Sequence, residues 1–275
     1  MIKDILVNLA VNSQRSAATD YAVSMATALD AHITGVAFAY EPVEVGSVFD
    51  GASASFIATF RQQNEATANA ALTKFNDTAR RNGLSAESHM LSASTGGAAD
   101  MFARMARTYD LAVVGQTEPD GSPAEDLILE AALFGSGRPV LVVPYIQKDA
   151  LKLDRVLLCW DGSRNAARAF ADAMPLLDRA KAIEVITIAN SDKRNELPGA
   201  DIAHHLARHS IKIELKRIVA PDTDVANTIL SHVADSSADL VVMGGYGHSR
   251  LREFVLGGAT RGMLSAMTVP TLMSH

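Results

Sequence analysis

An internal repeat constrains the fold of this chain more than any other feature of its sequence. Residues 110–115, DLAVVG, return as residues 239–244, DLVVMG, and residues 138–143, RPVLVV, are echoed by residues 269–273, VPTLM. The first apolar runs of the two halves, residues 5–7 and 156–158, correspond as well. The repeat predicts a tandem duplication with one domain in residues 1–147, another in residues 152–275, and a short joint between them.

Apolar strand-like runs alternate with alanine-rich helical stretches in both halves. In the first half, strands are expected at residues 4–9, 32–39, 85–92, 111–115 and 139–144, and helices at residues 16–29, 55–82, 97–109 and 124–134. In the second half, strands are expected at residues 155–160, 182–189, 213–218, 240–244 and 271–273. Continuous apolar strands separated by helices are typical of a parallel sheet covered on both faces. The prediction is an α/β fold of two tandem doubly wound domains, each a five-stranded parallel sheet with helices on both faces, Rossmann-like.

Composition narrows the class of protein. Of the 275 residues, 48% are hydrophobic and 20% charged, which is typical of a globular protein with a buried core. A net charge of -6 gives no general attraction to nucleic acid or anionic lipid. No apolar run approaches the roughly 20 residues of a membrane span, and the start of the chain does not read as a secretion signal. A single cysteine, Cys159, fits a reducing compartment and is expected in the core, so the expectation is a cytoplasmic protein without nucleic-acid or membrane partners.

A glycine-rich segment, residues 244–260 with the sequence GGYGHSRLREFVLGGAT, directly follows the apolar run of residues 240–243. Ligands of open parallel sheets bind beyond the carboxyl ends of the strands, and glycine there lets backbone N–H groups approach an anion. Ala259 and Thr260 open the last helix, whose N-terminus favours phosphate. The segment is therefore either a polyphosphate cradle or a loop without a ligand. It is not a P-loop, because the required lysine is missing, and Arg250 stands where a dinucleotide fingerprint needs a third glycine.

An acidic residue, Asp161, follows the first strand of the second half in the sequence CWDGS. If the strand order reverses between the first and fourth strands of this half, Asp161 and Gly244 are neighbours across the crevice. The carboxylate would then accept hydrogen bonds from a ribose hydroxyl or a base amino group. Ser163 is expected to cap the following helix.

The glycine segment and the DGS sequence after the first strand resemble the motifs of a known protein family. The second half resembles a universal stress protein domain, whose nucleotide-binding members have GxxG, nine residues, then Gly followed by Ser or Thr. The corresponding residues are Gly244 to Gly247, residues 248–256, and Gly257 with Gly258, and the DGS after the first strand also belongs to the family pattern. The repeat points to the tandem subclass.

The resemblance implies a bound ATP, with or without Mg²⁺. Asp161 would lie near the nucleoside, and the backbone of Ala189 and Asn190 would lie against the adenine. The residues expected around the phosphates are Met243, Gly244, Gly247, Gly257, Gly258, Ala259 and Thr260. His248 and Arg250 are either further phosphate contacts or solvent-exposed turn residues. Gly258 departs from the family pattern, and the lost hydroxyl bond would cost about 0.5 to 1.5 kcal/mol.

The first half lacks the same groups. Glu118 stands at the position of Gly247, and Ala10 stands opposite Asp161. The glycine turn that starts at Gly135 has no following helix to open. At most one nucleotide per chain is therefore expected, bound in the second half.

Two other features have competing interpretations. His205 and His209 have the spacing of a metal pair, but the sequence offers no third ligand, so a solvated helix face is favoured and no metal site is predicted. Residues 41–60 form an insertion with no counterpart in the second half, either a flap or partner surface, or a segment packed against its own sheet.

The predicted function is a cytoplasmic stress-response protein that binds ATP, or another adenine nucleotide, as a regulatory ligand. No catalytic residue is assigned, and at most slow ATP hydrolysis is expected. The alternative is an interaction scaffold of the same fold without a working nucleotide site. An enzyme of the related nucleotide-transferring folds is disfavoured, because no SGGxDS or HxGH segment occurs. The expected partners are the other domain of the chain, a second copy of it, and a protein that the sequence does not identify.

Overall fold

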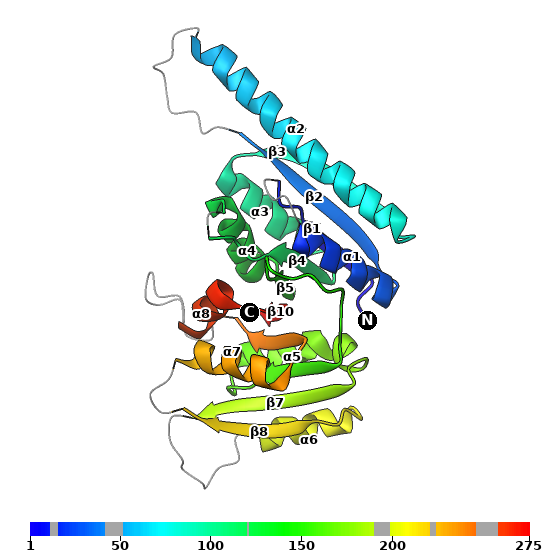
Figure 1. Cartoon of the computed structure of the whole chain (residues 1–275), viewed down its shortest axis with the longest axis vertical. Helices are drawn as coiled ribbons and strands as arrows, with labels where there is room; N and C mark the ends of the chain where they lie inside the picture. Colours follow the sequence, from blue (N-terminus) through cyan, green and yellow to red (C-terminus); the bar gives the residue numbers. More distant parts are fainter. Residues whose placement is uncertain (12–15, 42–51, 120, 190–198, 221–223, 246–257) are drawn as a thin grey trace. The chain divides into compact units, whose positions relative to one another are not determined.

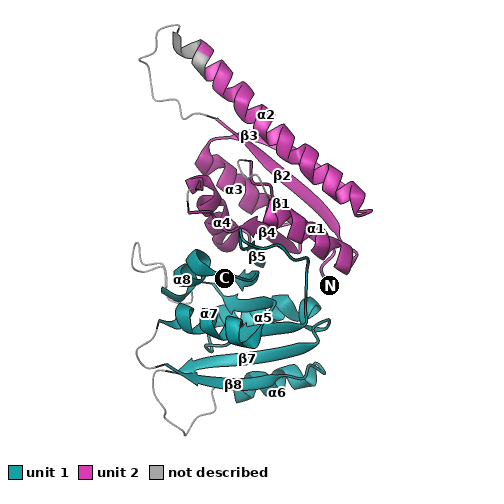
Figure 2. Ribbon diagram, viewed as in Figure 1, with its two compact units in different colours: residues 1, 139–275 teal, residues 2–138 magenta. Residues whose placement is uncertain are grey.

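The computed structural model describes the chain except for residues 12–15, 42–51, 120, 190–198, 221–223 and 246–257 (Figure 1). It divides into two compact units, residues 2–138 and residues 139–275, with Met1 grouped with the latter (Figure 2). The division falls just before a short strand at residues 140–143, which therefore belongs to the C-terminal unit.

The N-terminal unit alternates strands and helices. Its elements are β1 (Asp4–Asn8), α1 (Ala17–Leu29), β2 (His32–Tyr40), α2 (Ala52–Arg81), β3 (Ala86–Ala93), α3 (Thr95–Ala106), β4 (Leu111–Gly115) and α4 (Pro123–Gly135). The strands pair in parallel in the order β3-β2-β1-β4. Because α1 contacts α2 and α3 contacts α4, two pairs of helices enclose the sheet.

Local chemistry explains where these elements begin and how they pack. Serine side chains cap α1, α3 and α4: Ser16, Ser94 and Ser122 each accept a hydrogen bond from a backbone N–H of the first turn. The long helix α2 lies along β2 and β3 (Figure 1), where Phe75 covers Gly35 so closely that a Cβ at Gly35 would lie 2.8 Å from the ring.

The C-terminal unit has the same plan with two added strands. Its elements are β5 (Val140–Val143), β6 (Arg155–Cys159), α5 (Arg164–Leu177), β7 (Ala182–Ala189), α6 (Ala200–Arg208), β8 (Glu214–Val219), α7 (Val225–Ser236), β9 (Leu240–Gly244), α8 (Gly258–Ala266) and β10 (Thr271–Ser274). The strand order is β5-β10-β9-β6-β7-β8. All neighbours are parallel except β5 and β10, which are antiparallel.

The predicted α/β fold is confirmed, and the predicted strands agree with the observed ones to within one or two residues at each end. The run at residues 140–143, predicted as the last strand of the first half, forms a strand that pairs antiparallel with β10 and is grouped with the C-terminal unit. All four of its residues are buried, and an apolar run predicts that burial without fixing the direction of the neighbouring strand.

The insertion predicted at residues 41–60 falls in two parts. Residues 52–60 form the beginning of α2, and residues 42–51 lie outside the described residues. Among the helices that the structure describes, none combines the length and apolar character needed to cross a membrane.

Candidate functional site

The strand order of the C-terminal unit reverses at β6. This strand pairs with β7 on one side and with β9 on the other, and Cys159 at its end stands opposite Met243 of β9 and Ile186 of β7. Such a reversal opens a crevice at the carboxyl ends of the two central strands. The condition for bringing Asp161 close to Gly244 is therefore met.

A pocket of about 230 Å³ lies at this crevice. Its lining comes from the ends of β6 and β9, from one face of β7, and from the first turns of α7 and α8. The residues are Cys159, Trp160, Asp161, Ile186, Ile188, Val225, Ile229, Met243, Gly244, Gly258, Ala259 and Thr260. Six predicted site residues thus line one pocket: Asp161, Met243, Gly244, Gly258, Ala259 and Thr260.

A tight turn holds Asp161 at the rim. Its Oδ1 accepts a hydrogen bond of 2.9 Å from the backbone N–H of Ser163, and Gly162 between them has a φ of 76°. Ser163 in turn caps α5 by accepting a 3.1 Å bond from the N–H of Ala166, as predicted. The turn leaves Asp161 exposed at the pocket mouth, where its carboxylate is available to a ligand.

Gly244 is required for a reason that the sequence did not indicate. A Cβ at this position would lie 2.6 Å from the backbone nitrogen of Ala166 and 2.8 Å from the carbonyl carbon of Asn165. The end of β9 therefore packs directly on the first turn of α5, and only glycine fits.

Close helix packing positions the start of α8. A Cβ on Gly262 would lie 2.5 Å from the Cβ of Ala226, so α8 lies against α7 at small residues. This contact brings Gly258 and Thr260 beside Val225 at the pocket. Thr260 is buried, whereas a Cβ on Gly258 would meet no atom within 4 Å.

Other predicted site residues are not placed at the pocket. Ala189 ends β7 but does not line the pocket, and its carbonyl accepts a 3.0 Å hydrogen bond from the N–H of Ala220. The remaining predicted residues lie outside the described part of the chain: Asn190, Gly247, His248, Arg250 and Gly257.

The apolar wall of the pocket was missed by the sequence analysis. Ile186 and Ile188 alternate along β7 and so face the same side of the sheet, while Val225 and Ile229 are one turn apart on α7. These spacings are visible in the sequence, but nothing in it says that this face borders a ligand site.

The thiol of Cys159, at the end of β6, is protonated at neutral pH. Burial, and then the nearby carboxylate of Asp161, raise the pKa of the Cys159 thiol to about 12. At neutral pH the thiol is protonated, so it is neither an activated nucleophile nor a thiolate ligand.

The corresponding crevice of the N-terminal unit collects negative charge. Burial, then the carboxylates of Glu118 and Asp126, raise the pKa of Glu125 in the first turn of α4. Burial, and then the charge of Glu125, raise the pKa of Tyr40 to about 12. Thr117 donates a 2.6 Å hydrogen bond to Asp126. Carboxylates thus occupy the helix start at which an anion would otherwise be favoured.

The glycine turn of the first half lies at the other end of that helix. Gly135 is the last residue of α4, and the next element, β5, begins at Val140. As expected, no helix starts at this turn.

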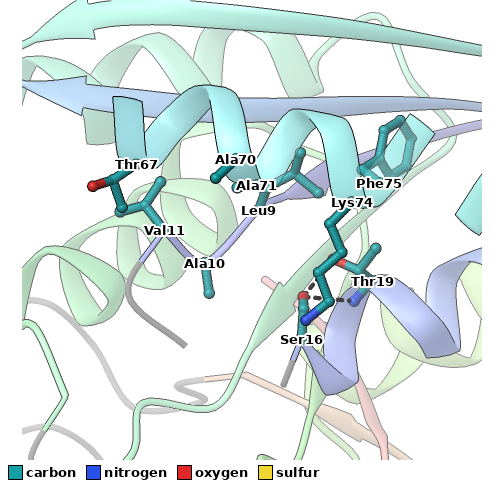
Figure 3. A pocket seen from close by; sticks show the side chains of 10 residues that line it. All are labelled: Leu9, Ala10, Val11, Ser16, Thr19, Thr67, Ala70, Ala71, Lys74 and Phe75. Atoms are coloured by element: carbon teal, nitrogen blue, oxygen red, sulfur yellow. Dashed lines mark hydrogen bonds between the residues drawn. The ribbon is translucent and has the colours of Figure 1, made fainter. Parts of the chain in front are cut away.

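A second pocket, of about 220 Å³, lies at the end of β1 (Figure 3). Its lining comes from β1 and the chain after it, and from α1 and α2: Leu9, Ala10, Val11, Ser16, Thr19, Thr67, Ala70, Ala71, Lys74 and Phe75. Ala10, the counterpart of Asp161, thus borders a pocket that α1 and α2 also line, and the described residues of this lining include no carboxylate.

His205 and His209, which have the spacing of a metal pair, lie at the C-terminal end of α6. The rings of His205 and His209 are 4.9 Å apart, edge to face. Within the described residues, no group of three or more His, Cys, Asp and Glu side chains is placed to hold a metal ion.

Comparison with known proteins finds a family match for the second half of the chain. Residues 152–275 match the model of the universal stress protein family. A universal stress protein from Synechocystis is 24% identical over 192 residues, which make up 68% of this chain and 65% of that protein. The match therefore spans slightly less than two thirds of the length of this curated relative.

Two solved structures share the fold over nearly the whole chain. A universal stress protein from Archaeoglobus fulgidus aligns with a TM-score of 0.71 and 15% identity, covering 98% of this chain and 97% of that one. A functionally unknown protein from Pseudomonas aeruginosa PAO1 aligns with a TM-score of 0.62 and 16% identity, covering 99% and 92% of the two chains. Residues 152–275 thus match the universal stress protein family, and nearly the whole chain shares its fold with these solved structures.

Proposed function

We propose that the C-terminal unit binds ATP, or another adenine nucleotide, as a regulatory ligand of a stress response in the cytoplasm. One observation carries the proposal. Three segments far apart in the sequence, residues 159–161, 243–244 and 258–260, meet around one pocket at the strand-order reversal. These segments hold the first-strand aspartate and both ends of the glycine segment.

The pocket is divided in a way that suits a nucleotide. Ile186, Ile188 and Val225 form an apolar wall against which a flat base can pack. Asp161 at the rim accepts hydrogen bonds from a ribose hydroxyl or a base amino group. The N-terminus of α8, at Gly258, favours a phosphate through its free N–H groups and its dipole.

Binding rather than turnover is proposed. Asp161 supplies the one carboxylate among the described residues that line the pocket, and the Cys159 thiol beside it stays protonated. A Mg²⁺ ion would be held mainly by the phosphates, as is usual for this ion. At most slow hydrolysis is expected, so the nucleotide would act by stabilising the unit and altering its choice of partner.

Gly258 allows a direct test by isothermal titration calorimetry with ATP. Because a Cβ at this position meets no atom of the described residues within 4 Å, Gly258→Val should fold normally and place its methyl groups where the ligand lies. The wild type is expected to bind ATP, and the variant to lose most of its affinity.

The matched control is Gly96→Val. Gly96 also lies in the first turn of a helix and also has no atom within 4 Å of its Cβ position, but it belongs to α3 of the N-terminal unit. This variant should bind ATP like the wild type. An absence of binding by the wild type, or equal binding by both variants, would refute the proposed function and leave an interaction scaffold as the better description.

A further inference from the structure

One side chain outside the pocket holds the start of the glycine segment. Asn165, in the first turn of α5, is only 3% exposed, and its Nδ2 donates a 2.6 Å hydrogen bond to the carbonyl oxygen of Gly245. The N–H of Gly245 donates a 2.8 Å bond to the carbonyl oxygen of Ser274 in β10. Both backbone polar groups of the first residue after β9 are therefore fixed.

Neighbouring contacts reinforce this hydrogen bond. Nδ1 of His275 lies 3.0 Å from Nδ2 of Asn165 and 3.1 Å from the carbonyl oxygen of Gly245. Directly before, Gly244 packs against the backbone of Asn165 and Ala166 without room for a Cβ. The place at which the chain leaves β9 is thus set by the first turn of α5.

The N-terminal unit has the same contact without the hydrogen-bond donor. Ala18 is the second residue after the cap Ser16, as Asn165 is the second residue after Ser163. A Cβ on Gly115, at the end of β4, would lie 3.7 Å from the Cβ of Ala18, so the helix start again faces the strand end. The methyl group of Ala18 cannot donate a hydrogen bond to a carbonyl oxygen. The N-terminal unit is also the one whose crevice contains the carboxylates of Glu118, Glu125 and Asp126.

We propose that Asn165 is a positioning residue for recognition of the polyphosphate chain, an inference that rests on the nucleotide function proposed above. A carbonyl oxygen carries partial negative charge, and one that turned toward the pocket would repel phosphate. The amide of Asn165 holds the Gly245 carbonyl on α5, and so fixes where the glycine segment leaves the sheet. Asn165 itself does not line the pocket.

The test compares ATP with AMP on Asn165→Ala, by competition against a fluorescent ATP analogue. The substitution reproduces what the N-terminal unit has at Ala18, so the fold should tolerate it. Loss of one hydrogen bond to a buried carbonyl should weaken ATP binding about five- to tenfold. AMP carries one phosphate and should be affected less, so the ratio of ATP to AMP affinity should fall.

Two further variants make the result specific. Asn165→Asp keeps the size but loses the donor, and it should lower the ratio at least as much. Ser274→Ala removes a 2.9 Å hydrogen bond between β10 and Asp172 of the same helix, without touching the Gly245 carbonyl, and should leave the ratio unchanged.

The outcomes separate this inference from the function on which it rests. If the wild type binds neither nucleotide, both fail. If the wild type binds ATP but Asn165→Ala keeps the wild-type ratio, or loses ATP and AMP affinity equally, the positioning role alone is overturned. Thermal melting of each variant establishes that it is folded.

Discussion

The two crevices of this chain are formed by strands and helices in nearly the same arrangement, but they place their carboxylate side chains at different positions. In both units the first strand pairs with the fourth, and a serine caps the helix that follows the first strand. At the start of the last helix, however, the N-terminal unit places Glu125 and Asp126, whereas the C-terminal unit places Gly258 and Ala259. The strand ends differ in the opposite sense, because Ala10 stands in the N-terminal unit where the C-terminal unit has the carboxylate of Asp161.

The comparison shows how little of a duplicated fold defines a site. The strands and helices that carry the core are retained in both halves, because buried apolar packing does not depend on a ligand. The chemistry lies in a few residues at strand ends and helix starts, which can change without loss of the fold. Three substitutions, taken from the largest expected effect to the smallest, break or sharpen this comparison.

The largest expected effect is a loss of stability on substitution of Gly244, the glycine that ends β9 of the C-terminal unit. Gly244→Ala would place a methyl group 2.6 Å from the backbone of Ala166, and backbone cannot move aside as a side chain can. We expect a loss of roughly 3 kcal/mol in the free energy of unfolding, at the upper end for overpacking. Urea denaturation measures it.

The matched variant is Gly115→Ala in the N-terminal unit. Its methyl group would lie 3.7 Å from Ala18, an ordinary contact, so the loss should be much smaller. Equal losses at the two positions would show that the close fit of β9 on α5 is not specific to the C-terminal unit.

A smaller effect is expected on ligand affinity. Gly258→Ser supplies the hydroxyl that nucleotide-binding members of the family carry, at a position with open space around it. One hydrogen bond to phosphate contributes about 0.5 to 1.5 kcal/mol, so ATP should bind roughly two- to twelvefold more tightly. Calorimetry measures the change. Unaltered affinity would mean that the start of α8 does not contact phosphate.

The smallest effect is expected from relieving charge in the N-terminal crevice. Because the pKa of Glu125 is raised in the folded state, its ionised form opposes folding at neutral pH. Glu125→Gln should therefore raise the melting temperature at pH 7. The advantage should disappear as the pH falls through the raised pKa toward the ordinary carboxyl value of about 4.3, where the glutamate is protonated in both states.

Melting curves of both proteins across this range of pH check the sign. A pH-independent difference would indicate that Glu125 acts through packing rather than charge. Asp20→Asn, which removes a carboxylate from the first turn of α1 in the same unit, serves as the control and should show no comparable gain.

The central strands of the fold could be predicted from the sequence because each is a continuous, mostly buried run bounded by polar turns. The runs at residues 111–115, 182–189 and 240–244 coincide with β4, β7 and β9. The antiparallel direction of the pairing between β5 and β10 could not be predicted from the apolar run alone, since burial does not fix the direction of a neighbouring strand.

The candidate site was predictable in part for a similar reason. Asp161, Gly244 and Gly258 stand at ends of elements, where a motif with fixed spacing identifies them. The wall formed by Ile188 and Val225 depends on which faces of β7 and α7 meet, and the close approach of Gly244 to α5 depends on the packing of the unit. Such information resides in the three-dimensional contacts and not in local sequence.

The assignment of β5 to the C-terminal unit bears on how that half of the protein should be produced in isolation. The family match begins at residue 152, but a fragment cut there would lack residues 140–143 and leave one edge of β10 bare. Unpaired strand edges promote association between molecules. A fragment that starts at Pro139 keeps β5 paired with β10 and contains all the described strands of the C-terminal unit, so it is the better choice for ligand-binding experiments on the C-terminal half alone.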